Sequence, residues 1–502
     1  MDPVTIEIIK NKLIGITEEM GASLVRTAFS PNIKERKDCS CAIFDSKGRL
    51  IAQAEHIPVH LGAMPFAVKA ILDREVKEGD VFILNDPYLG GTHLPDITLI
   101  SPVFERELIG FAVSRAHHSD VGGKTPGSMP SDSTEIYEEG LIIPPVKIIS
   151  EGKVQRDIFD LILNNVRTKR EREGDIKAQI SANKIGVQRF KEIYRKYNNF
   201  VGYLEEILNY SEKIVRKELK KMPDGVSSSE DHLEWKDPIK IKVKIEKKGD
   251  ELFIDFSGTD KEIHGNLNCV KSITLSSIYY MLICLMQRNI MINEGCYRPL
   301  HVKIPKRSIL NAEKPKAVAA GNVETSQRIV DVLMDAFSKI IPERVIAQSQ
   351  GTMNNLIIGG EYRGKNFTYY ETIGGGMGAS LFNDGESGIH SHMTNTLNTP
   401  VEALETEYPL RILRYSLREN SGGEGKHRGG DGIIREIQVL TDCTVSIISE
   451  RREIEPKGLF GGKNGKKGVN LLNGKKIPGK CTLKLKKGDI ITIKTPGGGG
   501  YG

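Results

Sequence analysis

The stretch VFILNDPYLGGTHLPDITLISPVF, residues 81–104, carries the pattern that decides the fold. Its segments VFILNDPY and DITLISPVF contain short apolar runs bounded by polar or glycine-rich residues, which is typical of buried strands. A third run of this kind, LIGFAVSRAHHSD (108–120), follows directly. The sequence therefore predicts several strands whose connecting loops are rich in aspartate, histidine and glycine.

The residues before this stretch predict a long helix and a hairpin. In 2–29 the apolar residues recur at helical spacing, and Pro3 stands near the start, where proline is favoured in helices. In SCAIFDSKGRLIAQAEH (40–56), two apolar runs flank the turn signal DSKG, which predicts a hairpin. A shorter helix is expected near 63–73.

The middle of the chain is expected to be mainly helical, with a break before the next strands. Residues 154–222 combine alternating charges with apolar spacing, which indicates helices with solvated faces. PDGVSSSED (223–231) is interpreted as a turn-rich break. From 238 onward, IKIKVKIEKKGDELFIDFSGT alternates with a period of two around KKGD, which predicts a hairpin. SITLSSIYYMLICLMQ (272–287) is shorter than the roughly 20 residues of a membrane span and predicts a buried core helix.

Glycine dominates the last third of the chain. TIGGGMGAS, NSGGEGKHRGGDGI and the closing TPGGGGYG alternate with short β-type runs. This pattern suggests a curled or barrel-like β region with tight loops. The predicted fold class is α+β, with more than one domain. We divide the chain into an N-terminal metal-site region at 1–153, a mainly helical region at 154–236 and a glycine-rich α+β region at 237–502.

Composition and charge are those of an ordinary globular protein. Apolar residues make up 39% and charged residues 27% of the chain. The net charge of +6 is small for 502 residues and argues against nucleic acid as a partner, because nucleic-acid binding requires a concentrated basic face. The seven scattered cysteines are typical of reduced thiols. Because the N-terminus lacks signal-peptide features and no stretch predicts a membrane span, we expect a cytoplasmic protein with no membrane partner.

The densest chemical signal lies in NDPYLGGTHLPDITL (85–99) and RAHHSDVGG (115–123). Imidazole and carboxylate groups together suit zinc, manganese or ferrous iron. Both segments are expected at loops beside apolar strands, where a rigid scaffold presents side chains to a cleft. The alternative is that these residues form caps and turns, as aspartate before glycine often does. The candidate side chains are Asp86, His93, Asp96, His117, His118 and Asp120.

The spacing of these residues limits which side chains can share one ion. His93 and Asp96 are three residues apart, so a loop or a single helical turn can direct both to one point. The adjacent His117 and His118 point to opposite sides if their segment is extended. Only one of these two histidines can then bind the same metal.

These motifs, together with KERKDCSCAIFD, GNVETSQR and TPGGGGYG, resemble the hydantoinase B/oxoprolinase family from about residue 2 to the C-terminus. The resemblance implies a metal held by a His-x-x-Asp pair and a later histidine, and the matching positions here are His93, Asp96 and His118. It also implies an earlier carboxylate, for which Asp38 is the best match and Glu35 the alternative.

The resemblance further implies an ATP-driven reaction on a cyclic amide such as a hydantoin or 5-oxoproline. A hydantoinase A-type partner would use ATP and Mg²⁺ to phosphorylate the amide oxygen, and this chain, with its divalent metal, would open the ring. Asp120 and His117 are candidates to orient water or relay a proton. Support of His118 is the alternative role for either residue.

Other polar residues in the motifs are weaker candidates. Glu324 in GNVETSQR and Asn395 in HSHMTNT could contact the substrate, with capping and surface hydrogen bonding as the alternative. His390 and His392 form an HxH pattern with no nearby acid and stay unassigned.

A phosphate-binding loop for ATP is not predicted within this chain. GKKIPGKC (474–481) nearly matches GxxxxGK[ST], but Cys481 takes the last position. The alternating segment CTLKLKKGDIITIK follows where a helix would have to begin, so a lysine-rich hairpin is favoured. We therefore expect a separate chain to handle ATP.

Two other functions fit the same resemblance. One is a subunit of an acetone carboxylase-type enzyme, although that subunit is longer in the family. The other is a non-catalytic assembly subunit that retains the fold. The complete set Asp38, His93, Asp96 and His118 argues against the second alternative.

Overall fold

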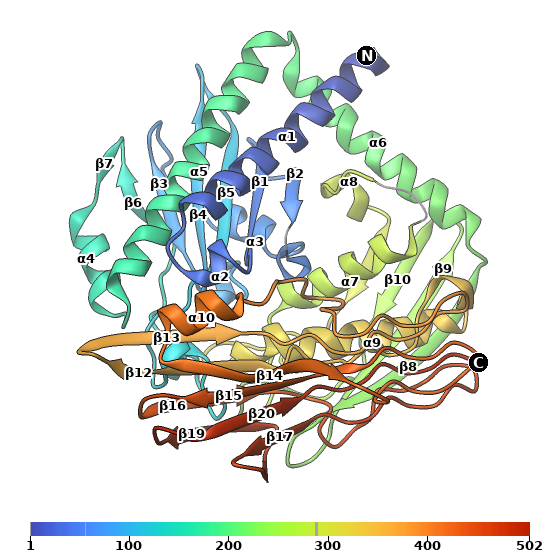
Figure 1. Ribbon diagram of the computed structural model, residues 1–502. Coiled ribbons are helices and arrows are strands. Elements are labelled where there is room, and N and C mark those ends of the chain that lie inside the picture. Colours follow the sequence, from blue (N-terminus) through green and yellow to red (C-terminus); the bar gives the residue numbers. More distant parts are fainter. Residues whose placement is uncertain (1, 56, 287–289) are drawn as a thin grey trace.

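The computed structural model describes residues 2–55, 57–286 and 290–502 (Figure 1). It contains one seven-stranded, one five-stranded and two four-stranded sheets together with helices, so the predicted α+β class is confirmed. Within the described part of the chain, no helix is both long and apolar enough to cross a bilayer.

The seven-stranded sheet contains the strands predicted from residues 81–120, and every neighbouring pair in it is antiparallel. The predicted hairpin at 40–56 is also present in it, up to residue 55; residue 56 lies outside the described residues. The strand order is β2 (Leu50–Glu55), β1 (Cys39–Asp45), β5 (Leu108–His117), β4 (Asp96–Phe104), β3 (Val81–Leu84), β6 (Val146–Ser150) and β7 (Lys153–Val154).

Helices cover both faces of this sheet. The predicted N-terminal helix is α1 (Pro3–Thr27), and it packs with α5 (Lys169–Lys196) on one face (Figure 1). The short α3 (Met64–Lys69) packs on the other face, where helix was expected near 63–73. The remaining helices of this half are α2 (Pro31–Lys34), α4 (Arg156–Asn164) and α6 (Phe200–Lys221).

A four-stranded sheet follows, and it corrects one prediction. The expected break at 223–231 is wrong, because Gly225–Leu233 form strand β8. Ser227 and Ser229 point inward and donate hydrogen bonds to the Ala336 carbonyl and the Asp335 carboxylate, both on helix α9 (Ser326–Ser338). Serine can therefore occupy inward positions that a periodicity argument reserves for apolar residues.

The same sheet contains the predicted hairpin after residue 238. It runs in the order β11 (Leu300–Lys303), β10 (Glu251–Asp255), β9 (Ile239–Lys248) and β8. Helix α9 packs on β8 and β9, and α7 (Lys271–Leu285) packs against α9. Helix α7 is the predicted buried helix; residue 287 of that prediction lies outside the described residues. The short α8 (Glu294–Tyr297) precedes β11.

The last third forms two open sheets with a shared apolar core in place of the expected barrel-like region (Figure 1). One contains β13 (Lys365–Glu371), β12 (Asn355–Tyr362), β16 (Cys443–Ile448) and β19 (Lys480–Leu485). The other contains β14 (Leu410–Arg418), β15 (Gly432–Val439), β20 (Ile490–Lys494), β17 (Val469–Leu472) and β18 (Lys475–Ile477), with α10 (Val401–Glu407) beside β14. The segment GKKIPGKC forms β18 and the start of β19, and the chain then continues as strand.

The closing glycines run through the middle of several loops. The amide groups of Gly498, Gly499 and Gly500 donate to three different segments, at the carbonyls of Gly430, Gln348 and Lys463. A Cβ atom at Gly498 would overlap the Met377 carbonyl oxygen, so only glycine allows this approach. The C-terminus therefore ties the loops of the last third together.

Candidate metal centre

The centre of the candidate site is the cross-strand pair Asp96 and His117. Asp96 begins β4, His117 ends β5, and the two are Cα partners in the antiparallel ladder. Partners in such a ladder point to the same face of the sheet. The Asp96 Oδ1 atom accordingly lies 3.3 Å from His117 Nδ1.

Two further histidines approach the same carboxylate. His93, in the loop before β4, places Nδ1 3.1 Å from Asp96 Oδ2. His60, in the 3₁₀ turn Pro58–His60, places Nε2 3.4 Å from the same oxygen. The Nδ1 atom of His60 is 2.9 Å from the Ser40 hydroxyl, which holds the ring with Nε2 toward Asp96.

Ligand atoms of His93, Asp96 and His117 all lie within 4.8 Å of one another, close enough to hold one ion. All three side chains are buried. Asp96 Oδ1, His117 Nε2 and His60 Nε2 have no hydrogen-bond partner, although buried polar atoms normally have one. These unbonded atoms fit a divalent metal, because imidazole and carboxylate are its usual ligands.

A small cavity joins this cluster to Asp38. Its volume is about 20 Å³, which is room for a single water molecule or ion. Asp38, His60, Asp96 and His117 line one part of the cavity. The Asp38 carbonyl accepts the His117 backbone N–H at 3.0 Å, so these two residues are also linked through the main chain.

Charges in the cluster shift its titration. Burial alone would raise the pKa of Asp96, but His93, His117 and His60 outweigh it and hold that pKa well below its usual range. Burial lowers the pKa of His117, although the hydrogen bond to Asp96 opposes that shift. A neutral imidazole beside an ionised carboxylate is the state in which both groups can bind a metal.

Two residues of the C-terminal half complete the wall of the cavity. The Tyr370 ring stacks on His117 with centroids 4.7 Å apart, and its hydroxyl donates to Asn355. The Asn322 amide lies 2.7 Å from His93 Nδ1. The candidate site is therefore built from both halves of the chain.

His118 and Asp120 lie away from the cavity. His118 Nε2 is 2.9 Å from the Gln179 side-chain oxygen on α5, and burial lowers its pKa to about 4. Asp120 accepts hydrogen bonds from the backbone of Gly122 and Gly127 and pairs with Arg167 at 2.9 Å. In this structure both residues connect the sheet to neighbouring segments.

The remaining candidates also lie outside the cavity lining. Glu324 is buried behind the wall, where one oxygen accepts from Asn355, and burial raises its pKa to about 8. Asn395 is exposed, although its neighbours Thr394 and Thr396 line the cavity. Asp86 caps the turn at Tyr88. Glu35 closes helix α2.

His390 and His392 do not join the His93–Asp96–His117 cluster. His392 Nε2 lies 4.0 Å from Asp331, and its Nδ1 lies 3.4 Å from the Tyr280 hydroxyl. Burial lowers the pKa of His390 to about 4.

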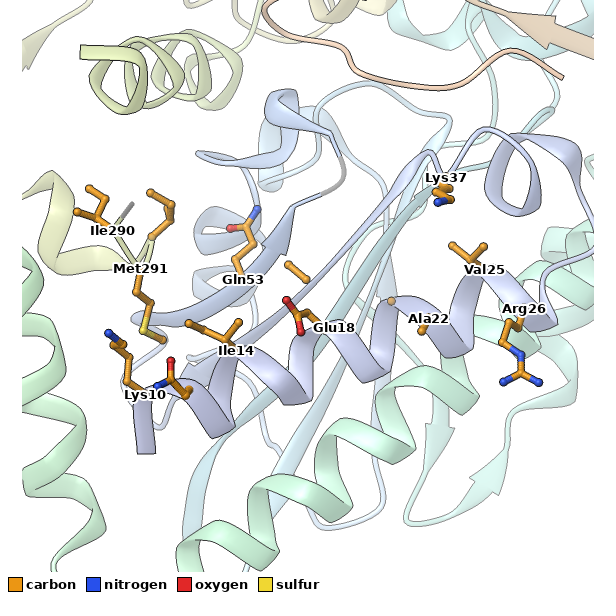
Figure 2. A pocket seen from close by; sticks show the side chains of 14 residues that line it. Lys10, Ile14, Glu18, Ala22, Val25, Arg26, Lys37, Gln53, Ile290 and Met291 are labelled. Carbon is orange, nitrogen blue, oxygen red and sulfur yellow. The ribbon is translucent and has the colours of Figure 1, made fainter. Parts of the chain in front are cut away.

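A larger cavity of about 850 Å³ lies elsewhere, between α1, the β1–β2 hairpin and residues 290–292 (Figure 2). Lys10 and Arg26 lie near its two ends. Lys37, which precedes Asp38 in the chain, is also part of its lining. Within the described residues this lining contains no group of metal-binding side chains, so we place the chemistry at the His/Asp cluster.

Comparison with known proteins agrees with these motifs. The hydantoinase B/oxoprolinase family model matches residues 2–502. The chain belongs to this family. It is 47% identical to an uncharacterized protein of Methanocaldococcus jannaschii, covering all of this chain and 91% of that one.

Two relatives have names that state an activity. The chain is 41% identical to 5-oxoprolinase 1 of Arabidopsis thaliana and 33% identical to a Pseudomonas protein named as the B-type subunit of a D-/L-hydantoinase. All of the chain aligns with each of them, but it spans only 42% of the former, against 90% of the latter.

Solved structures share the fold. The ATP-dependent caprolactamase of Pseudomonas jessenii superposes with a TM-score of 0.94 at 30% identity, covering all of this chain and 91% of that one. An acetone carboxylase superposes with a TM-score of 0.89 over all of this chain and 76% of that one. At 19% identity this match shows the fold alone.

Proposed function

We propose that this chain is the metal-dependent, ring-opening subunit of an ATP-dependent enzyme that acts on a cyclic amide. The observation that carries the proposal is the buried His93–Asp96–His117 cluster at a cavity with unbonded polar atoms. A 5-oxoprolinase, a hydantoinase subunit and a caprolactamase among the relatives support a cyclic amide as the substrate.

Asp38, His93, Asp96 and His117 are the residues that we expect to hold a divalent ion, zinc, manganese or iron. His117 takes the place of His118 in this set, because only His117 shares a face with Asp96. A bound ion of this kind lowers the pKa of a coordinated water to about 7 and polarises a carbonyl oxygen.

Neighbouring residues would fix the orientation of these ligands. The Thr92 hydroxyl donates to Asp96, Asn322 contacts His93, and the ring of Tyr370 covers His117. Partners of this kind set the direction of a ligand and are costly to remove. Their burial also excludes bulk water from the reacting groups.

We assign the ATP step to a hydantoinase A-type partner that uses Mg²⁺ and phosphorylates the amide oxygen. The Pseudomonas relative carries the name of one subunit type among two, which supports a two-chain enzyme. The near-match to a phosphate loop at GKKIPGKC forms strands and lacks the helix that such a loop requires.

Reconstitution tests this division of work. The purified chain alone should neither hydrolyse ATP nor open 5-oxoproline, hydantoin or caprolactam. Adding the partner should produce both activities together, and removing the metal with a chelator should stop ring opening until a divalent ion is restored. ATP hydrolysis by the chain alone, or full ring opening by a metal-free complex, would contradict the proposal.

A further inference from the structure

Three threonines form a row of hydroxyl groups on the cavity wall. Thr372 follows strand β13, and Thr394 and Thr396 lie in the loop before α10. All three are buried and line the same cavity as Asp96 and His117. The small cavity therefore has a carboxylate–imidazole part and a hydroxyl part.

A buried arginine supports this row. Arg36 has no exposed surface, and its Nη2 atom donates to Thr372 Oγ1 at 2.9 Å and to Thr396 Oγ1 at 3.4 Å. Its Nη1 atom donates to the Tyr370 carbonyl and to the Asn32 side chain. In the described part of the chain, no carboxylate forms an ion pair with this guanidinium. Its positive charge is therefore applied to neutral oxygens.

The hydrogen bonds leave the row with a proton to donate. Thr372 and Thr396 share a bond of 2.7 Å, and Thr394 and Thr396 share one of 3.5 Å. Three hydroxyl protons serve two internal bonds, so at least one proton remains for a group in the cavity. Because two of the oxygens already accept from a guanidinium, the row is a better donor than acceptor.

We propose that Thr372, Thr394 and Thr396, backed by Arg36, form an oxyanion site for the ring-opening reaction. This inference rests on the proposed function. The cavity of about 20 Å³ admits one oxygen atom and is too small for a whole phosphate group. Donors fixed in advance around such an oxygen stabilise the negative charge that develops on it.

The negative oxygen comes from water. A water oxygen forms a bond to the amide carbon, whose own oxygen keeps the phosphoryl group. Both protons of the water pass, through a base of the site, to the ring nitrogen, which lost its own proton when the amide oxygen was phosphorylated. After the second proton leaves, the water-derived oxygen is an oxyanion. It then re-forms a carbonyl as the carbon–nitrogen bond breaks, with the electron pair left on nitrogen.

The test removes one hydroxyl while preserving side-chain volume. In the reconstituted complex, Thr396→Val should lower kcat for ring opening by about 10²–10³-fold, the usual effect of losing one oxyanion donor. KM, bound metal and substrate-dependent ATP consumption should stay close to those of the unmodified complex. Thr396→Ser, which restores a hydroxyl, should recover most of kcat.

Thr368→Val is the matched control. Thr368 is a buried threonine of β13 whose hydroxyl has no partner and lies outside the cavity, so its loss should leave kcat unchanged. An unchanged kcat in Thr396→Val, or a loss equal to that of Thr368→Val or to a loss of bound metal, overturns the oxyanion site. An unmodified complex that opens no cyclic amide overturns the proposed function itself, and the oxyanion site with it.

Discussion

The side chains of Asp96 and His117 meet because their backbones are partners across two antiparallel strands. Successive residues of a strand point to opposite faces, so a shift of one residue moves a side chain to the other side of the sheet. His118, one position later, is directed at Gln179 on α5. The alternation alone predicts that only one histidine joins Asp96, but the register decides which one.

The neighbouring histidines give a direct prediction. His117→Ala should weaken divalent-metal binding by more than about 100-fold, because losing even a hydrogen-bond partner of a ligand costs about 10–100-fold. His118→Ala should retain one metal per chain but lower the free energy of unfolding by about 1–3 kcal/mol, since Gln179 loses its buried partner. Metal content and calorimetric titration of both variants measure this. The reverse order of metal affinities would exclude His117 as the ligand.

Other residues of the candidate site were beyond reach of the sequence for different reasons. Asn322 belongs to the motif GNVETSQR, but nothing in that motif indicates that it contacts His93. His60 reaches Asp96 from a turn more than 30 positions earlier, with no spacing pattern that joins the two. Tyr370 lies in an ordinary β-type run. These contacts depend on how the halves of the chain pack.

At the scale of elements, periodicity predicts most helices and strands because their apolar faces are regular. Helix α1 and the β1–β2 hairpin follow from it directly. Strand β8 does not, because its inward serines are satisfied by partners on α9. The open sheets of the last third also escape prediction, since glycine-rich loops resemble one another whatever sheets they connect.

A buried ion network joins β8 to α9 and to the segment after β16. Asp231 on β8 lies 3.3 Å from Arg451 and 3.9 Å from Arg328. Burial would raise the pKa of Asp231, but the charges of Arg328 and Arg451 outweigh it and lower that pKa below 3.8. The ionised carboxylate therefore stabilises the fold above pH 3.8, and this contribution is lost as the pH falls below that value.

Asp231→Asn should lower the free energy of unfolding by about 3–5 kcal/mol at pH 7, because it leaves buried arginines unpaired. The difference from the unmodified protein should shrink as the pH is lowered below 3.8. Thermal unfolding as a function of pH measures both effects. Glu173→Gln, in an exposed pair with Lys177, is the control and should change little. Equal effects of the two substitutions would mean that the buried network does not stabilise the fold.

At the scale of the whole molecule, the candidate site lies where the N-terminal sheet meets the C-terminal sheets. Arg36 reaches the Tyr370 carbonyl and Thr372, and Tyr370 stacks on His117. The glycine-rich loops of the last third are in turn held together by the closing residues. Stability of the C-terminal third should therefore affect the site, although the two are far apart in the sequence.

Gly498→Ala tests the role of the closing glycines. The added methyl group meets backbone on a neighbouring loop that cannot move aside, so the free energy of unfolding should fall by about 3 kcal/mol or more. Gly15→Ala is the matched control, because its Cβ would meet nothing within 4 Å on α1. It should stabilise the protein by about 0.5–1 kcal/mol. Chemical denaturation of both variants gives the comparison, and a tolerated Gly498→Ala would contradict the close packing.

The central claim is that the metal ligands of this chain act after the ATP step of a partner. The most direct measurement is the ratio of phosphate released to amide cleaved in the reconstituted complex with His93→Ala. Phosphoryl transfer depends on the phosphate and Mg²⁺ site of the partner, whereas ring opening depends on the His93–Asp96–His117 cluster. We predict that substrate-dependent ATP consumption continues while amide cleavage falls by orders of magnitude, so the ratio rises steeply. A ratio unchanged from the unmodified complex, with both rates reduced in parallel, would contradict this account.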